Sequence, residues 1–79
     1  MRLDKFLKVS RLIKRRTVAN QASDNGRVLI NGKVSKPSAK VSVGDVIEIT
    51  FGDNVSKIKV LEISEHVGKD AAKNMYEIL

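Results

Sequence analysis

Apolar residues at the start of the chain recur with the spacing of a helix. Leu3, Phe6 and Leu7 stand at positions i, i+3 and i+4, and basic residues occupy the remaining circumference. This pattern predicts a short amphipathic helix. Asp4 and Lys8 lie one turn apart and are expected to form an ion pair on it, which makes Asp4 a structural residue in this interpretation.

A second helix is predicted over about residues 16–24. Ala19 and Ser23 form a stripe of small residues along it, which would let another element pack closely. Asn25 and Gly26 follow, and this pair favours the left-handed conformation that ends helices. The two helices are therefore expected to be separate and joined by a basic linker.

A hairpin is predicted over residues 27–34. Two short β-prone runs flank Asn31 and Gly32, and a type I′ turn needs positive φ at both central positions, which Asn and Gly tolerate best. Gly26 is likewise expected to need positive φ. Lys33 then stands beside the turn, at the tip of the hairpin.

Two further strands are predicted. In residues 46–51, Ile47, Ile49 and Phe51 alternate with polar residues, which predicts a half-buried strand with these three side chains on its inner face. Residues 57–63 predict another strand. Its inner face stays open, because apolar residues occur on both parities and allow a bulge or burial on two sides.

The tail of the chain, residues 69–79, predicts a short C-terminal helix. Its apolar residues Ala71, Met75 and Ile78 stand at positions i, i+4 and i+7. Since a domain takes about 100 to 200 residues, the 79 residues leave room for a single small domain, residues 1–79.

Composition excludes several function classes. The chain has no cysteine and one histidine, His66, so it offers no disulfide, no Cys/His zinc site and no Cys/His catalytic pair. It also has no Gly-rich phosphate-binding loop. We therefore expect a protein that is not an enzyme and uses no metal or cofactor, with His66 as an ordinary loop residue.

The sequence predicts neither a membrane span nor a secretion signal. The longest apolar run is three residues, Val28–Ile30, and the charged N-terminus lacks the apolar core of a signal peptide. A basic membrane-surface anchor is an alternative reading of the first helix, but its apolar stripe covers barely two turns. We expect a cytoplasmic protein.

The net charge of +6 is unevenly distributed. Residues 1–40 hold eleven Lys or Arg and two acidic residues, whereas residues 41–79 hold four Lys and seven acidic residues. Seven basic residues fall within the first sixteen positions, which is more than solubility requires. Because a surface of one sign attracts polyanions, the N-terminal half is predicted to bind nucleic acid.

The aromatic content indicates how nucleic acid would be bound. Proteins that read single strands stack bases on aromatic side chains, but this chain has only three, and two lie on predicted apolar faces. Recognition of a folded phosphate backbone by Arg and Lys remains. Backbone amides at the start of the second helix, beside Arg15, Arg16 and Thr17, would add to it. The aromatic residues are Phe6, Phe51 and Tyr76.

Four short motifs follow one another along the chain: Met1-Arg2-Leu3-Asp4-Lys5-Phe6-Leu7, Lys14-Arg15-Arg16-Thr17-x-Ala19, Asn25-Gly26-Arg27-Val28-x-x-Asn31-Gly32-Lys33 and Gly44-Asp45-x-Ile47. Together they resemble the RNA-binding domain family named after small-subunit ribosomal protein S-four, over about residues 1–51. The resemblance implies an α+β fold, with two N-terminal helices packed on a small, mostly antiparallel sheet. An additional strand and a short C-terminal helix would occupy about residues 55–79. Many relatives have Ser at the position of Arg15, so Thr17 is the substitute candidate for the helix N-cap.

The whole chain, above all residues 1–17 and 71–76, is also similar to small stand-alone bacterial factors of ribosome-associated quality control, relatives of the heat-shock S-four protein. This similarity implies a monomer that binds obstructed large ribosomal subunits. It would contact large-subunit rRNA and peptidyl-tRNA, and would support RqcH in adding C-terminal alanines to stalled chains. The alternative is an rRNA-binding accessory domain of an RNA-modifying system that resembles the pseudouridine synthases.

The resemblance also assigns candidate RNA contacts. Basic residues near the start of the chain would bind rRNA phosphates, and neutral neighbours would add hydrogen bonds. Two lysines at and after the hairpin tip would contact tRNA. The phosphate contacts are Arg2, Arg11, Lys14, Arg15 and Arg16; Lys5, Lys8 and Arg27 complete the RNA-binding surface; the neutral residues are Thr17 and Asn20; the tRNA contacts are Lys33 and Lys36.

Overall fold

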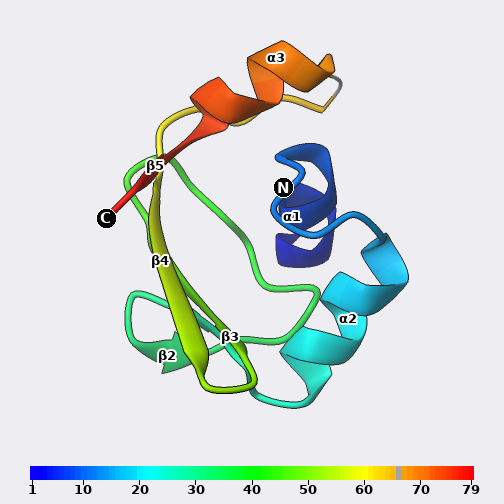
Figure 1. The fold of residues 1–79 in the computed structure, drawn as a ribbon, viewed down its shortest axis with the longest axis vertical. Helices are drawn as coiled ribbons and strands as arrows, with labels where there is room; N and C mark the ends of the chain where they lie inside the picture. Colours follow the sequence, from blue (N-terminus) through cyan, green and yellow to red (C-terminus); the bar gives the residue numbers. More distant parts are fainter. Residues whose placement is uncertain (66) are drawn as a thin grey trace.

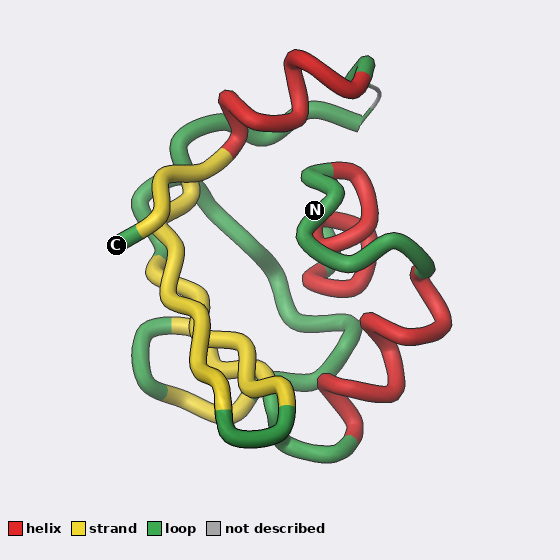
Figure 2. The backbone as a smooth tube through the Cα atoms, in the orientation of Figure 1, coloured by secondary structure: helices red, strands yellow, loops and turns green. Residues whose placement is uncertain are grey.

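The computed structural model describes residues 1–65 and 67–79. Within these residues, five strands form one antiparallel sheet in the order β2-β1-β3-β4-β5. Figure 1 shows α1 and α2 on one side of this sheet and α3 across its end, and Figure 2 separates the same helices and strands by colour. The expected α+β fold is confirmed. The elements are α1 (Leu3–Val9), α2 (Arg16–Asp24), β1 (Val28–Ile30), β2 (Lys33–Val34), β3 (Val46–Phe51), β4 (Asn54–Val60), α3 (Lys69–Ala72), the 3-10 helix η1 (Lys73–Met75) and β5 (Tyr76–Ile78).

The hydrophobic core joins α1 and α2 to the inner face of the sheet. The apolar stripe of α1 is completely buried, and the small residues of α2 are buried as predicted. Both halves of the chain contribute to the same cluster. Its members include Leu3, Phe6, Leu7, Ala19, Ala22, Val28, Val41, Ile47, Ile49, Ile58, Val60 and Met75. Across the described part of the chain, no helix is long and apolar enough to cross a membrane.

Backbone groups of the loop at residues 37–41 cap the start of α1, which has no side-chain N-cap. The Leu3 N–H donates to the Ala39 carbonyl at 2.8 Å, and the Asp4 N–H donates to the Pro37 carbonyl at 3.1 Å. These bonds satisfy amides that an isolated helix leaves without partners. These bonds also hold the loop beside the N-terminus, although the two segments are far apart in the sequence.

The predicted turns are confirmed at Gly26 and at the hairpin tip. Gly26, Asn31 and Gly32 have φ values of 72°, 52° and 81°. Asn31 has a further role, because its side-chain nitrogen donates to Asp45 Oδ1 at 3.1 Å and its Oδ1 accepts from the Val46 N–H at 2.9 Å. The hairpin tip is thereby tied to the start of β3.

Two details of β3 and β4 differ from the prediction. Phe51 does not join the inner face: it is 44% exposed, because it lies at the end of β3, opposite Asn54 and next to the turn. Strand β4 begins and ends three residues earlier than predicted. Its inner face, which the pattern left open, carries Ile58 and Val60, whereas Leu61 follows the strand and is exposed.

The prediction of a helix over the whole tail is wrong. Helical structure ends at Met75, and the next three residues pair with β4, with Tyr76 opposite Val60 and Ile78 opposite Ile58. The free edge of β4 supplies backbone partners, and Tyr and Ile favour strands. Of the predicted apolar stripe only Met75 is buried, so a continued helix would gain little burial.

Replacing Ile47 by Ala tests the core. We expect Ile47→Ala to lower the free energy of unfolding by about 2–5 kcal/mol, because Ile47 is fully buried in the central strand and its loss leaves a cavity. Val55→Ala on exposed β4 surface is the control, with an expected change below about 1 kcal/mol. Urea unfolding measures both, and equal losses would contradict the assigned core.

Candidate nucleic-acid interface

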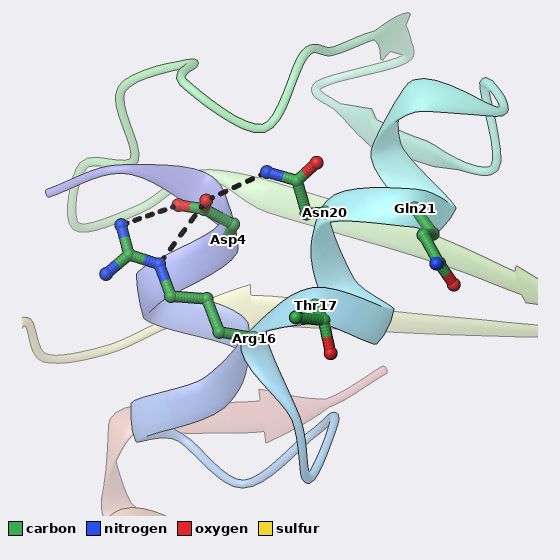
Figure 3. Close-up of a pocket in the computed structure, with 5 residues that line it drawn as sticks. All are labelled: Asp4, Arg16, Thr17, Asn20 and Gln21. Atoms are coloured by element: carbon green, nitrogen blue, oxygen red, sulfur yellow. Dashed lines mark hydrogen bonds and ion pairs between the residues drawn. The ribbon is translucent and has the colours of Figure 1, made fainter.

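The carboxylate of Asp4 lies where α1 meets α2, and three side chains converge on it. The Asp4 side chain is 3% exposed. Arg2 contacts it through Nε at 3.3 Å and Nη2 at 3.3 Å, and Arg16 through Nε at 3.4 Å and Nη2 at 3.4 Å. Asn20 donates its side-chain N–H to Oδ2 at 3.3 Å, and the Lys5 backbone N–H donates to Oδ1 at 2.8 Å. Figure 3 shows Arg16 and Asn20 reaching Asp4 from α2.

These contacts keep Asp4 ionised. Burial alone would raise the pKa of the Asp4 carboxyl, but hydrogen bonds from Arg16 and Asn20, the charge of Arg16 and the Lys5 N–H together lower this pKa below its ordinary value of 3.8. A buried carboxylate is tolerated only when it is paired and hydrogen-bonded. Asp4 therefore acts as a fixed negative centre for cationic side chains.

The expected ion pair between Asp4 and Lys8 does not form. Asp4 turns to partners on α2, whose Arg16 and Asn20 lie one turn apart and face α1. Lys8 is exposed on α1. A position that packs against a neighbouring helix offers a carboxylate several donors at once, which a single exposed lysine does not.

Two arginines predicted as phosphate contacts have this internal acidic partner. The side chains of Arg2 and Arg16 nevertheless stay 52% and 46% exposed. A guanidinium carries five N–H donors, and each arginine donates one hydrogen bond to Asp4 through Nη2, with Nε at ion-pair distance. The remaining donors stay available to a ligand, and the contact with Asp4 fixes the orientation of both guanidinium planes.

The other predicted bases are distributed over three places. Four are exposed on α1 and in the linker that leads to α2, and Arg27 is exposed just after α2. Lys5 pairs with Glu65 Oε1 at 3.5 Å. Lys33, in the edge strand β2, and Lys36, which precedes the loop at residues 37–41, are exposed. These four exposed basic residues, called the basic linker residues below, are Lys8, Arg11, Lys14 and Arg15.

The sequence prediction missed Lys40. Residues 2 and 40 form an antiparallel bridge, so their side chains project to the same side, and Lys40 is exposed. No local pattern could reveal this pairing, because the partners are far apart in the chain. We call Arg2, Arg16 and Lys40 the cationic platform.

An open cavity of about 400 Å³ adjoins the platform. Its lining combines charged and neutral polar groups (Figure 3). Gln21, which the sequence prediction also missed, joins the lining because it stands one turn after Thr17 on α2. Thr17 does not act as the substitute N-cap: no side chain caps α2, which begins after Arg15. The lining residues are Asp4, Arg16, Thr17, Asn20 and Gln21.

Among the described residues, no group of three or more His, Asp or Glu side chains could hold a metal ion. His66, predicted to be an ordinary loop residue, lies outside the described residues. The chemistry that the described site offers is hydrogen bonding and ion pairing with an anionic ligand.

Replacing Asp4 by Asn tests the role of its charge. Because the folded-state pKa of Asp4 is lowered, its stabilising contribution is complete above about pH 3.8 and is lost as the pH falls further. We expect Asp4→Asn to lower the free energy of unfolding by about 1–3 kcal/mol at pH 7. Urea unfolding at pH 7 and at pH 3 should show this difference from wild type shrinking with acidity.

Asp53→Asn is the matched control for this measurement. Asp53 is exposed in the turn between β3 and β4, so its replacement should leave the free energy of unfolding nearly unchanged at both pH values. A gap between wild type and Asp4→Asn that stays constant from pH 7 to pH 3 would contradict the assigned role of the Asp4 carboxylate.

Comparison with known proteins gives a consistent result. Residues 1–47 match the model of the S4 domain family. The chain is 51% identical over all 79 residues to the RQC P-site tRNA stabilizing factors of Streptococcus pneumoniae and Bacillus subtilis, of which it covers 90% and 92%. It is 37% identical to the heat shock protein 15 homolog of Aeromonas salmonicida, over 82% of this chain and 49% of that protein.

Solved structures agree with this relationship. The trimeric structure of heat shock protein 15 from Vibrio cholerae superposes with a TM-score of 0.91 at 32% identity, over 100% of this chain and 81% of that one. The solution structure of HP1423 gives a TM-score of 0.85 at 30% identity, over 100% and 96%. The chain therefore belongs to the S4 domain family and, within it, to the RQC P-site tRNA stabilizing factors.

Proposed function

We propose that this chain is a non-catalytic RNA-binding factor of ribosome-associated quality control, which binds large-subunit rRNA and P-site tRNA on the large ribosomal subunit. The observation that carries the proposal is the array around Asp4, where Arg2 and Arg16 are oriented and half-exposed. Relatives matched over the whole chain are named for stabilising P-site tRNA.

The chemistry of the cationic platform supports rRNA as its ligand. A guanidinium fork matches the geometry of a phosphate, and a fork already held by Asp4 loses less freedom on binding. The basic linker residues and the start of α2, which has no side-chain cap, extend the same positive surface along the chain. Binding of about five phosphates would make affinity fall with salt at a log-log slope of about −4 to −5.

The position of Lys33 in β2, outside the platform, supports a second RNA contact, and Lys36 follows it beside the loop at residues 37–41. Lys33 stands in the edge strand β2 of the sheet (Figure 1). A protein with basic groups on two separate parts of its surface is suited to bridge two RNA molecules. We assign the platform to rRNA and these two lysines to peptidyl-tRNA.

The remaining expectations belong to the same proposal. The factor acts in the cytoplasm as a monomer. It supports RqcH in adding alanines to stalled nascent chains by keeping the tRNA in place. Residues 1–79 act as one domain, since β4 and β5 complete the sheet that carries the RNA-binding segments.

Sedimentation with purified large subunits tests the division of roles. We expect the chain to bind subunits that carry P-site tRNA about tenfold more tightly than empty subunits. Arg15→Ala should weaken binding to both by a similar factor and reduce the salt slope by about 1, because it removes a phosphate contact. The double variant Lys33→Ala, Lys36→Ala should reduce only the increase in affinity that P-site tRNA provides. Equal binding to both kinds of subunit would contradict the tRNA assignment.

Arg11 provides a test that separates binding from stability. Arg11 adopts φ 63° at the end of α1, a left-handed conformation that costs a non-glycine residue about 1 kcal/mol. Arg11→Gly should therefore raise the free energy of unfolding by about 0.5–1 kcal/mol while weakening binding to subunits about threefold to tenfold. Urea unfolding and sedimentation measure the two effects.

Arg11→Ala is the matched variant, because it removes the guanidinium but keeps the unfavourable backbone conformation. It should weaken binding as much as Arg11→Gly does without the gain in stability. Unchanged binding in both variants would remove Arg11 from the RNA contacts.

A further inference from the structure

Asn20 presents a hydrogen-bond acceptor within a basic surface. Its side-chain nitrogen donates to Asp4 Oδ2 at 3.3 Å. A carboxylate only accepts hydrogen bonds, so the amide nitrogen must face Asp4 and the amide oxygen must face away from it. Figure 3 shows this oxygen turned away from Asp4. Asn20 is partly buried, and its contact with Asp4 holds the amide in this orientation.

The groups around Asn20 make a phosphate an incomplete ligand for this cavity. Arg16 supplies cationic donors, but Thr17, Asn20 and Gln21 are neutral. A phosphate offers only acceptors, and the oxygen of Asn20 needs a donor. A donor group of the ligand would not bind Asp4 instead, because both oxygens of Asp4 already accept hydrogen bonds, from three side chains and one backbone N–H in total.

A ribose with its adjoining phosphate supplies both kinds of group. The phosphate accepts from Arg16, and the 2′-hydroxyl of the ribose both donates and accepts. The 2′-hydroxyl is also the group that distinguishes RNA from DNA. The cavity of about 400 Å³ is large enough for one sugar-phosphate unit.

We propose that the cavity between α1 and α2 binds a ribose of the RNA backbone, and that Asn20 accepts a hydrogen bond from its 2′-hydroxyl, so that this residue selects RNA over DNA. Thr17 and Gln21 are exposed and line the same cavity. This inference rests on the proposed RNA-binding function and adds the feature of RNA that the site reads.

Three hairpins of one sequence test the inference: RNA, the same RNA with 2′-fluoro groups in place of 2′-hydroxyls, and DNA. The 2′-fluoro hairpin keeps the shape of an RNA helix but has lost the 2′ donor. We expect the chain to bind RNA about threefold to tenfold more tightly than 2′-fluoro RNA, the effect of one hydrogen bond. In Asn20→Ala this ratio should fall to about one.

The ratio of affinities for RNA and 2′-fluoro RNA distinguishes a direct contact of Asn20 with the 2′-hydroxyl from a role of Asn20 in holding the side chains around Asp4. Asn20→Ala also removes one donor from Asp4, but a disturbed array weakens binding to RNA and to 2′-fluoro RNA alike and leaves their ratio unchanged. Arg15→Ala is the control, and it should weaken binding to all three hairpins by the same factor. Equal affinity of the wild type for RNA and 2′-fluoro RNA, or an unchanged ratio in Asn20→Ala, would overturn the inference.

The outcome also separates this inference from the proposed function. Salt-dependent binding to all three hairpins without a 2′ preference would overturn only the ribose contact and leave phosphate recognition in place. Absence of salt-dependent binding to any hairpin and to large subunits would overturn both.

Discussion

The buried carboxylate of Asp4 is the constraint on which the N-terminal half of the structure depends. An ionised group at 3% exposure is tolerated only if it is paired, and its partners come from the chain before α1 and from α2. The packing of α2 on α1 therefore depends on the same contacts that place Arg2, Arg16 and Asn20. The apolar stripe of α1 supplies the burial, and the carboxylate selects the orientation in which α2 packs.

This arrangement explains how a strongly basic segment can also be well ordered. Positive side chains that lie close together repel one another, and a long side chain loses rotamer freedom when it is fixed. Asp4 offsets both effects for Arg2 and Arg16, because it supplies a negative charge and a fixed hydrogen-bonding direction. What remains at the surface is two oriented guanidinium groups beside Lys40, whose backbone bridge to residue 2 fixes its place. Geometry as well as charge then contributes to recognition of a phosphate backbone.

The sequence allowed prediction of features that depend on local chemistry and hid those that depend on distant contacts. The helix stop at Gly26 and the hairpin turn at Asn31 follow from the φ values that these residues favour, so both were predictable. The tail was not, because Tyr76 to Ile78 become a strand only through the free edge of β4. The partners of Asp4 and the position of Lys40 were hidden for the same reason, since they are set by helix packing and by a bridge across the chain.

The division of charge along the chain has a structural meaning that composition alone did not reveal. Two acidic residues of the second half pair with lysines that are not part of the platform: Glu65 with Lys5 at 3.5 Å, and Glu48 with Lys57 at 3.1 Å. Asp45 instead holds the hairpin tip through Asn31. Residues of the acidic half thus neutralise two lysines that are not part of the platform and position the hairpin, while the platform keeps its excess of positive charge. A molecule whose charges are sorted in this way meets a polyanion in one preferred orientation, so the hairpin is carried to a defined place relative to the bound RNA.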